Sequence, residues 1–437
     1  MKKLTYLFLA LIIVACSSDD SSGGDNNEPS NCDVAYLDSN GVTIKACEDA
    51  EVYSTGVING ITYTVVNEIV LRDMIENEED VSKLVTTKVT DMSSMFGGSA
   101  FNQDISSWDV SNVTDMEKMF NAAESFNQPI GNWDVSNVTD MEKMFNAAES
   151  FNQPIGNWDV SNVTDMTNMF SSNTAFNQPI GDWDVSSVTD MTKMFYGNFG
   201  FNQPIGDWDV SSVTDMTEMF LSNTAFNQPI GDWDVSNVTD MFQIFYGAEV
   251  FNQDIGSWDV SNLTYTSAMF AYAYDFNQPI GDWDVSNVTD MGGMFARAAS
   301  FNQDIGNWDV SNVTDMYAMF ANTPFNQDIS TWDVGNVTHM DLMFQDAITF
   351  NQDLSNWDVS SVINMDSMFN YATAFNQDIS SWDVSSVYRI SLMFSNATSF
   401  NQNLNSWNVD NVTICNSFSE NAPLTEANTP NFTNCTP

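Results

Sequence analysis

The chain has 437 residues, of which 43% are apolar and 13% aromatic, so it can bury a large core and is too apolar for a disordered acidic chain. Its 59 acidic and 11 basic side chains give a formal net charge of −48, which argues against nucleic acid as a partner because phosphates would be repelled. The chain has one histidine, His339, which argues against His-rich metal sites and against Ser-His or Cys-His catalysis.

Residues 1–15 have the features of a secretory signal. Lys2 and Lys3 precede an apolar stretch over residues 4–15, which is too short to cross a bilayer as a helix. The stretch ends in Ile-Val-Ala-Cys, which resembles a bacterial lipobox with Cys16 as the lipidated residue. This resemblance implies cleavage before Cys16 and a lipid anchor in the membrane at that residue. The alternative is an ordinary secretory signal with an incidental cysteine.

Residues 16–31 are predicted to be a flexible tether. Ser, Gly, Asp and Asn dominate the segment after Cys16, and none of these residues is apolar. The serines and acids directly after Cys16 are similar to the surface-export signal of lipoproteins in the Bacteroidetes group. That similarity implies an outer-membrane lipoprotein exposed at the cell surface.

Four cysteines remain if Cys16 carries lipid, and they form two local pairs near the ends of the mature chain. An oxidising compartment favours the disulfides Cys32–Cys47 and Cys415–Cys435 among the three possible connectivities. Each disulfide would close a loop of about 15–20 residues, worth roughly 3 kcal/mol in the chain-entropy model. A metal site is the alternative, but the chain has no CxxC motif and no histidine near these cysteines.

Residues 89–418 form a tandem repeat, and its Phe-Asn-Gln motif recurs from Phe101 with a period of 25 residues, interrupted by one single-residue deletion between Phe301 and Phe325. Phe-Asn-Gln recurs in every copy, and a tryptophan follows seven residues after each of these phenylalanines, which accounts for all 13 tryptophans. Residues 111–135 and 136–160 are identical, which indicates duplication of a whole unit.

The first half of a unit predicts a short strand. Trp108 and Val110 alternate with polar residues over 105–111, which is the period of two that a half-buried strand shows. The frame from Ile105 to Val110 also matches the L-x-x-L-x-L frame of leucine-rich repeats. The sequence therefore predicts one strand in each copy.

The second half of a unit predicts a short helix. Thr114 can cap it, and the acid that follows suits the first turn. Met116, Met119 and Phe120 then lie on one apolar face at helical spacing. The acids at this start position are expected to cap helices. They are Asp91, Asp115, Asp140, Asp165, Asp190, Asp215, Asp240, Asp290 and Asp315, interrupted by Tyr265, His339, Asn364 and Arg389.

One strand and one helix cannot bury their apolar faces alone, whereas stacked copies can. The fold class predicted is an α/β solenoid of the leucine-rich-repeat kind over residues 88–418, with about 13 coils, closed by a C-terminal cap at 419–437. Aligned asparagines such as Asn127 are expected to be buried and to bond the loop backbone between coils.

The unit FNQDISSWDVSNVTDMxxMF resembles the repeats of the BspA family of leucine-rich-repeat surface proteins, also known as the mycoplasma-type lipoprotein repeat of unknown function. The resemblance covers about residues 55–420. Residues 57–66, followed by a helix-like segment at 67–77, look like the cap of these proteins, and a small α+β cap is therefore expected at 32–87. The resemblance implies a surface-displayed binding or adhesion protein without catalytic residues, and it does not name the ligand.

An aspartate follows the tryptophan in 12 successive copies, and four copies carry a second aspartate two residues earlier. If Trp and Val point inward, these carboxylates face outward, where like charges one strand apart repel each other. Bound Ca²⁺ would relieve the repulsion, whereas solvated carboxylates bonded to turn hydroxyls are the alternative that we favour. The densest part of this possible calcium or ligand face comprises Asp182, Asp184, Asp207, Asp209, Asp232, Asp234, Asp282 and Asp284.

Specificity is expected where the copies differ. Tyr265, Tyr272 and Tyr274 cluster in one copy and are a candidate exposed patch, with irregular packing as the alternative.

The sequence favours a non-enzymatic surface lipoprotein that binds a protein or glycan through the solenoid, with no required cofactor. One alternative is a structural envelope protein without a specific ligand. The other is a polysaccharide-acting enzyme that uses a pair of aspartates. The repeat would copy any such pair in successive coils, so no pair is set apart as a single active site.

Overall fold

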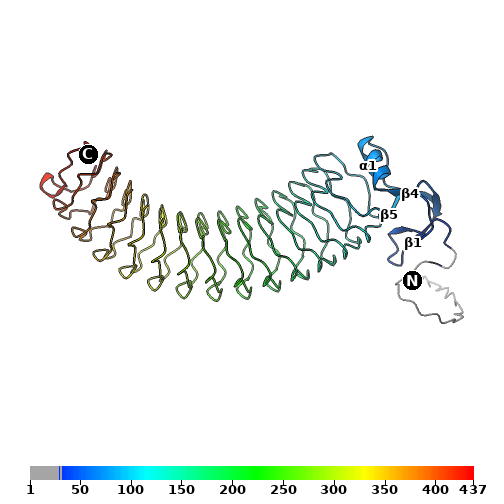
Figure 1. The fold of residues 1–437 in the computed structure, drawn as a ribbon, viewed down its shortest axis with the longest axis horizontal. Helices are drawn as coiled ribbons and strands as arrows, with labels where there is room; N and C mark the ends of the chain where they lie inside the picture. Colours follow the sequence, from blue (N-terminus) through cyan, green and yellow to red (C-terminus); the bar gives the residue numbers. More distant parts are fainter. Residues whose placement is uncertain (1–28, 30–31) are drawn as a thin grey trace, which may run out of the picture.

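The structure, a computed structural model, describes residue 29 and residues 32–437. The predicted signal peptide, the lipidation site Cys16 and all of the predicted tether except residue 29 lie outside the described residues. Figure 1 shows a long arch of coils stacked side by side, with a small folded cap at its N-terminal end. Within the described part of the chain, no helix has the length and apolar character needed to cross a bilayer.

The N-terminal cap contains two small sheets and one helix. The elements are β1 (Ala35–Leu37), β2 (Ile44–Ala46), β3 (Thr55–Ile58), β4 (Ile61–Asn67), α1 (Glu68–Glu76) and β5 (Leu84–Lys88). Strands β1 and β2 form an antiparallel pair, and a second sheet has the order β3-β4-β5, in which β3 and β4 are antiparallel and β4 and β5 are parallel.

Local sequence explains the boundaries of these elements. Asn59 and Gly60 both have positive φ, and an Asn-Gly pair in this conformation gives the two-residue turn that joins β3 to β4. The Asn67 side chain accepts a hydrogen bond from the Val70 N–H at 3.0 Å, so it caps the start of α1. Leu71 then anchors the helix because its side chain is fully buried against the coils.

A disulfide links two parts of the cap, and hydrogen bonds connect the cap to the first coil. The predicted Cys32–Cys47 disulfide is present, with its Cα atoms 5.8 Å apart. The N–H of Ile44 donates to the carbonyl of Ser107 at 2.9 Å, and the Trp108 indole donates to the carbonyl of Val81 at 3.1 Å. The cap therefore covers the open end of the coil stack, which is the name we use for residues 89–418.

The predicted strand in each coil is wrong. Residues 105–111 form turns: the Trp108 N–H donates to the Ile105 carbonyl at 3.1 Å, and the Val113 N–H donates to the Val110 carbonyl at 2.9 Å. Trp108 and Val110 still point inward and are almost fully buried. Alternation of polar and apolar residues therefore marked the inward side chains correctly, although a chain of turns and not a pleated strand presents them.

The predicted helix in each coil is also wrong. The N–H of Met119 donates to the carbonyl of Met116 at 3.2 Å, three residues back and not four. Lys118 and Ala122 have φ of 57° and 55°, which a right-handed helix cannot contain but which the third residue of a type II turn requires. We call residues 116–123 and their equivalents in every coil the turn ribbon, and its eight positions are numbered from Met116.

Hydrogen bonds between coils replace the bonds that a helix would make within itself. In the turn ribbon, Met116, Lys118 and Phe120 donate their backbone N–H groups to carbonyls of the next coil at 2.7–3.1 Å. Single parallel bridges, such as the one between Asp115 and Asp140, connect the start of each ribbon to the next. The spacing of Met, Met and Phe that fits one face of a helix therefore also fits this turn ribbon, whose hydrogen-bond partners lie in the neighbouring copies.

Aromatic ladders fill the interior of the coil stack. The rings of Trp133 and Trp158 lie 6.5 Å apart and are inclined by only 3° to each other, and the Phe145 and Phe170 rings lie 5.7 Å apart. The Trp158 indole donates to the Ile130 carbonyl of the preceding coil at 3.1 Å, and this bond recurs along the stack. Burial of each such ring contributes roughly 1.5–3 kcal/mol.

The asparagine ladder is confirmed as a bonding feature, but its predicted burial is wrong. Asn127 is exposed, and its side-chain oxygen accepts hydrogen bonds from the Asn152 N–H at 3.1 Å and from the Gln153 amide at 2.9 Å. Because one asparagine bonds both residues of the next copy, the Phe-Asn-Gln motif links the loops at the surface of the stack.

The C-terminal segment covers the last coil. It contains one short 3-10 helix, η1 (Glu426–Asn428), and the predicted Cys415–Cys435 disulfide is present with a Cα separation of 6.0 Å. The ring of Phe432 packs edge-on against Phe418 at 5.1 Å.

Candidate functional site

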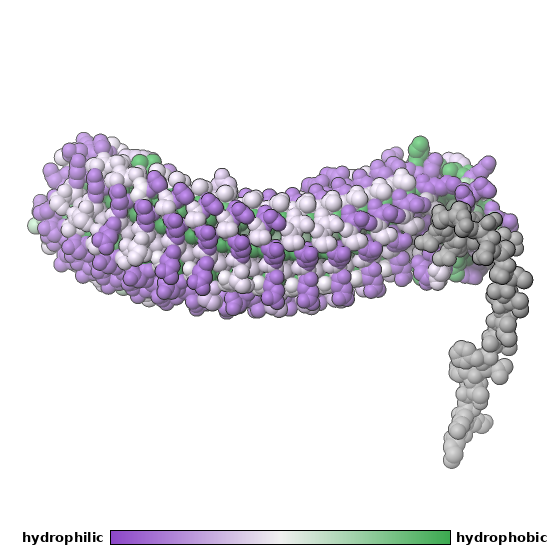
Figure 2. Space-filling model, turned by 60° about the horizontal axis from the view of Figure 1, so that its bottom comes forward, coloured by the Kyte–Doolittle hydropathy of each residue, from purple (hydrophilic) through white to green (hydrophobic). Residues whose placement is uncertain are grey.

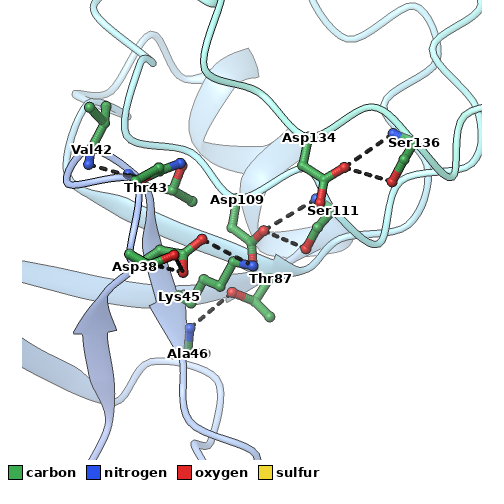
Figure 3. A network of polar contacts seen from close by, with 12 residues as sticks. Asp38, Val42, Thr43, Lys45, Ala46, Thr87, Asp109, Ser111, Asp134 and Ser136 are labelled. Carbon is green, nitrogen blue, oxygen red and sulfur yellow. Dashed lines mark hydrogen bonds and ion pairs between the residues drawn. The ribbon is translucent and has the colours of Figure 1, made fainter. Parts of the chain in front are cut away.

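The aspartate after each tryptophan is part of a turn. Asp134 is exposed, and its Oδ1 accepts hydrogen bonds from the Ser136 N–H at 3.2 Å and from the Ser136 hydroxyl at 2.6 Å, as Figure 3 shows. In equivalent coils the serine hydroxyl and the backbone N–H hold the pKa of Asp184, Asp234 and Asp259 below the usual range. The outward carboxylates therefore close turns. This is the arrangement that we favoured over bound calcium from the sequence, in which the carboxylates bond to turn hydroxyls.

The first aspartate of this row differs because the cap buries it. Asp109 is 2% exposed and lies near Lys45, whose ammonium pairs with Asp38 at 3.3 Å (Figure 3). Burial alone would lower the pKa of Lys45, but the Asp109 and Asp38 carboxylates outweigh it and raise that pKa. This cluster therefore joins the cap to the stack and is not an accessible site.

The eight aspartates of the predicted calcium face are all exposed, and they occupy four coils. Asp207 and Asp232 line one shallow hollow together with Asp254. In residue 29 and residues 32–437, no group of three or more His, Cys, Asp or Glu side chains is arranged to hold a metal ion. Calcium binding at this face stays a prediction.

The acids at the predicted helix starts begin turns instead. Asp140 accepts a hydrogen bond from the Glu142 N–H, two residues ahead, at 2.9 Å, so the helix-dipole interpretation is wrong because no helix follows. Burial and the neighbouring carboxylates of Asp165 and Asp115 raise the pKa of Asp140. This row is a ladder of like charges that the backbone hydrogen bonds hold together.

One exception in this row is compensated by a neighbour. Arg389 stands where other coils have aspartate, and its guanidinium pairs with Asp366 at 2.6 Å. The second oxygen of Asp366 accepts the Ser391 N–H at 2.7 Å, which is the bond that an aspartate at position 389 would have made. The substitution therefore keeps the turn and adds an ion pair between coils.

Much of the sequence variation between coils lies at the exposed positions of the turn ribbon. Over the arch as a whole, hydrophilic residues form rows that run from coil to coil (Figure 2). In three consecutive coils the third and sixth ribbon positions hold only small residues, where other coils carry residues such as Lys118 and Asn121. These small residues are Ala268, Ala271, Gly293, Ala296, Ala318 and Ala321.

The small residues form the floor of a hollow of about 420 Å³, which we call the ribbon trough. Tyr246 lines one end, and Leu342 and Gln345 line the other. The long sides are lined by Tyr272, Arg297, Asn322, Asp346 and Tyr317. The trough is therefore an open, partly aromatic groove across three coils.

The sequence of the repeats matches a protein family along most of the chain. The matched segments are residues 67–181, 164–274, 251–347 and 321–432, and the family is described as a Mycoplasma protein of unknown function, DUF285. The chain belongs to the DUF285 family. No curated protein matches this DUF285 chain.

A crystal structure of a TLR13–ssRNA13 complex is similar to this DUF285 chain at 12% sequence identity and a TM-score of 0.23. The similarity covers 73% of this chain and 49% of that chain, so it spans about half the length of the solved protein. A likeness this weak carries no functional argument. The family match confirms the predicted repeat family of unknown function, whereas the BspA and lipoprotein assignments stay proposals.

The tyrosine patch predicted from the sequence is present in part in the DUF285 structure, because the rings of Tyr272 and Tyr274 lie edge-on with their centroids 6.4 Å apart. Tyr272 lines the ribbon trough and packs against Tyr246 with ring centroids 5.2 Å apart. Tyr265 and Tyr274 are exposed but do not line the trough. Comparing the copies position by position would have found the trough, because three successive copies lose the large residues at the third and sixth ribbon positions.

Proposed function

We propose that this DUF285 protein is a non-enzymatic surface lipoprotein that binds a macromolecular partner, a protein or a glycan, through the exposed face of its coil stack. The observation that carries the proposal is the contrast between interior and surface. The inward Trp, Phe and Met positions repeat from coil to coil and are nearly all less than 5% exposed, so the interior offers no room for a ligand. The copies differ at exposed ribbon positions, where an extended repeat surface can contact a large partner.

Binding of the full-length chain to glycan arrays and to a panel of extracellular proteins tests this proposal. Saturable binding to a macromolecule supports it. A chain that is folded but binds nothing on either panel would overturn it in favour of a structural envelope role, and turnover of a bound polysaccharide would favour an enzyme.

The proposed anchor rests on Cys16. Replacement of Cys16 by Ala should remove the lipid and release the protein from the membrane fraction, as measured by fractionation and immunoblotting. The matched control is Ser17→Ala, which leaves the cysteine in place and should stay with the membrane. Retention of Cys16→Ala would contradict the lipoprotein assignment.

Exposure at the cell surface is tested separately by protease treatment of intact cells. The coil stack should be cleaved when the protein is displayed outside the cell. Protection from the protease would place the protein on the periplasmic side.

A further inference from the structure

The ribbon trough has a shape that suits a chain-like ligand. It crosses three coils, and the stacked Phe295 and Phe320 rings beneath it lie 5.9 Å apart. Ala296 and its small neighbours keep the floor low, whereas the walls carry larger side chains. A ligand that lies along the stack can therefore contact several coils at once.

Arg297 at the edge of the trough is free to bind an anion. In the described coil stack the other basic side chains each pair with a carboxylate within 4.0 Å: these are Lys118, Lys143, Lys193 and Arg389. Arg297 forms no such pair, and its guanidinium lies 5.3 Å from the centre of the Tyr272 ring. An unpaired arginine is unusual in a chain with a net charge of −48, and the guanidinium is suited to bidentate bonds with a carboxylate.

The remaining walls offer contacts that sugars use. The rings of Tyr246 and Tyr272 lie side by side at 5.2 Å, and Tyr317 is 46% exposed. Aromatic rings with a hydroxyl present both an apolar face and a polar tip. The amides of Asn322 and Gln345 supply donors and acceptors for hydroxyl groups.

We propose that the ribbon trough binds a glycan in which an isolated carboxylate, such as that of a uronic acid, occurs among neutral sugars. Arg297 binds the carboxylate, and the tyrosines pack against sugar rings. This assignment rests on the proposed function and names the ligand of one part of that surface.

The surrounding charge restricts the ligand further. Asp346 lines the trough, and the aspartate row at the ribbon starts runs past it with Asp290 and Asp315. A densely charged polyanion is repelled by these acids and by the whole chain. A single carboxylate bound to Arg297 is affected less, because charges farther away than about 8 Å are screened at physiological ionic strength.

Calorimetric titration of the full-length chain at 0.15 M NaCl tests the ligand class. The probes are an oligosaccharide in which one glucuronic acid occurs among neutral sugars and the same oligosaccharide with its carboxyl reduced to an alcohol. The acidic form should bind at least tenfold more tightly. The Arg297→Gln variant should lose that preference, whereas Lys193→Gln, which removes a positive charge from the same face outside the trough, should keep it. Equal affinity of the wild type for both probes would overturn the assignment.

A trough-filling variant tests the location. Ala296→Leu places a leucine side chain in the trough. Leu221 occupies the same ribbon position in another coil, so the fold should accept a leucine there. It should abolish binding of the acidic probe without lowering the melting temperature. Unchanged binding by Ala296→Leu would show that the glycan binds elsewhere, which overturns the trough site and leaves the proposed function standing. Absence of any macromolecular ligand on the arrays would overturn both.

Discussion

The serine two residues after each outward aspartate stabilises the ionised carboxylate. At Asp259 the Ser261 hydroxyl, at 2.6 Å, and the Ser261 N–H, at 3.1 Å, lower the pKa. A carboxyl whose pKa is lowered on folding contributes stability that is present above its unfolded pKa of about 3.9 and is lost as the pH falls through the folded value. The stabilisation from these turns is therefore present at neutral pH and disappears in acid below about pH 4.

The variant Ser261→Ala should lower the urea midpoint at pH 7, and its difference from the wild type should shrink as the pH falls from 4 to 2. The reason is that a protonated Asp259 gains less from the hydroxyl. The matched control is Ser257→Ala, because the Ser257 hydroxyl donates to the Gly231 carbonyl and not to a carboxylate. Its difference from the wild type should not change with pH. A pH-independent effect of Ser261→Ala would contradict this account.

Two buried asparagines at the eighth ribbon position predict opposite mutational effects. Both polar atoms of Asn198 are bonded: its amide nitrogen donates to the Phe176 carbonyl, and its oxygen accepts the Phe201 N–H, both at 3.2 Å. The side-chain atoms of Asn223 are buried without a partner. Most coils have alanine at this position, as Ala123 illustrates, so the backbone accepts alanine at both sites.

We expect Asn198→Ala to destabilise the protein by about 1–2 kcal/mol and Asn223→Ala to stabilise it by a similar amount, because an unbonded buried amide costs about 1–3 kcal/mol. Thermal unfolding of the two variants in parallel measures the difference. Destabilisation of equal size in both would mean that Asn223 is bonded in solution.

At the scale of single elements, the turn ribbon shows what the sequence could and could not predict. The spacing of Met116, Met119 and Phe120 correctly identified three buried side chains. It could not distinguish a helix from successive turns, because both place residues three and four apart on one side. Which of the two forms depends on hydrogen bonds to the next copy and on positive φ at Lys118 and Ala122. Lysine and alanine are not residue types that indicate a positive φ.

The ribbon trough was predictable only in part for a related reason. Tyr272 was singled out by its neighbours in the sequence, whereas Arg297 and Tyr317 come from the two following coils and became neighbours through stacking. The periodicity aligned these residues by position, but only the structure shows that the small residues between them leave a hollow.

The C-terminal segment is an element whose attachment can be tested. Cys415 is fully buried in the last coil, and its disulfide to Cys435 closes a loop with a sequence separation of 20 residues. Cys435→Ser should release residues 419–437, since a loop of this size contributes roughly 3 kcal/mol in the chain-entropy model. Hydrogen exchange should rise in that segment and in the last coil, with central coils unchanged. Thr436→Ala, an exposed neighbour, is the control, and equal protection in both variants would contradict the stapling role.

At the scale of the whole molecule, the stack combines a continuous core with a surface of one charge sign. Each coil contacts its neighbours through ring ladders and ribbon hydrogen bonds, so stability is approximately a sum over adjacent pairs. The same alignment repeats every exposed aspartate along the arch, and the formal charge reaches −48. Attraction in the interior and repulsion at the surface therefore both grow with each added coil.

This repulsion predicts how salts act on the protein. At about 0.01 M salt the Debye length is roughly 30 Å, so the aspartate rows repel each other across several coils, and added NaCl should raise the melting temperature. Asp209 and Asp234 already bond Ser211 and the Ser236 N–H, and the described residues contain no group of three potential ligands for a metal ion. We therefore expect CaCl₂ to raise the melting temperature no more than NaCl at equal ionic strength.

Calcium that binds a specific site would behave differently, because a ligand of the native state stabilises it by mass action. The melting temperature would then rise and saturate at millimolar calcium or below. That rise would disappear when Asp207, Asp209, Asp232 and Asp234 are changed to Asn. A variant with Asp38→Asn, in the cap and away from this face, is the control that should keep any such effect. If the two salts act alike and the fourfold variant melts higher than the wild type only at low salt, the aspartates form a solvated acidic face whose repulsion the aromatic core overcomes.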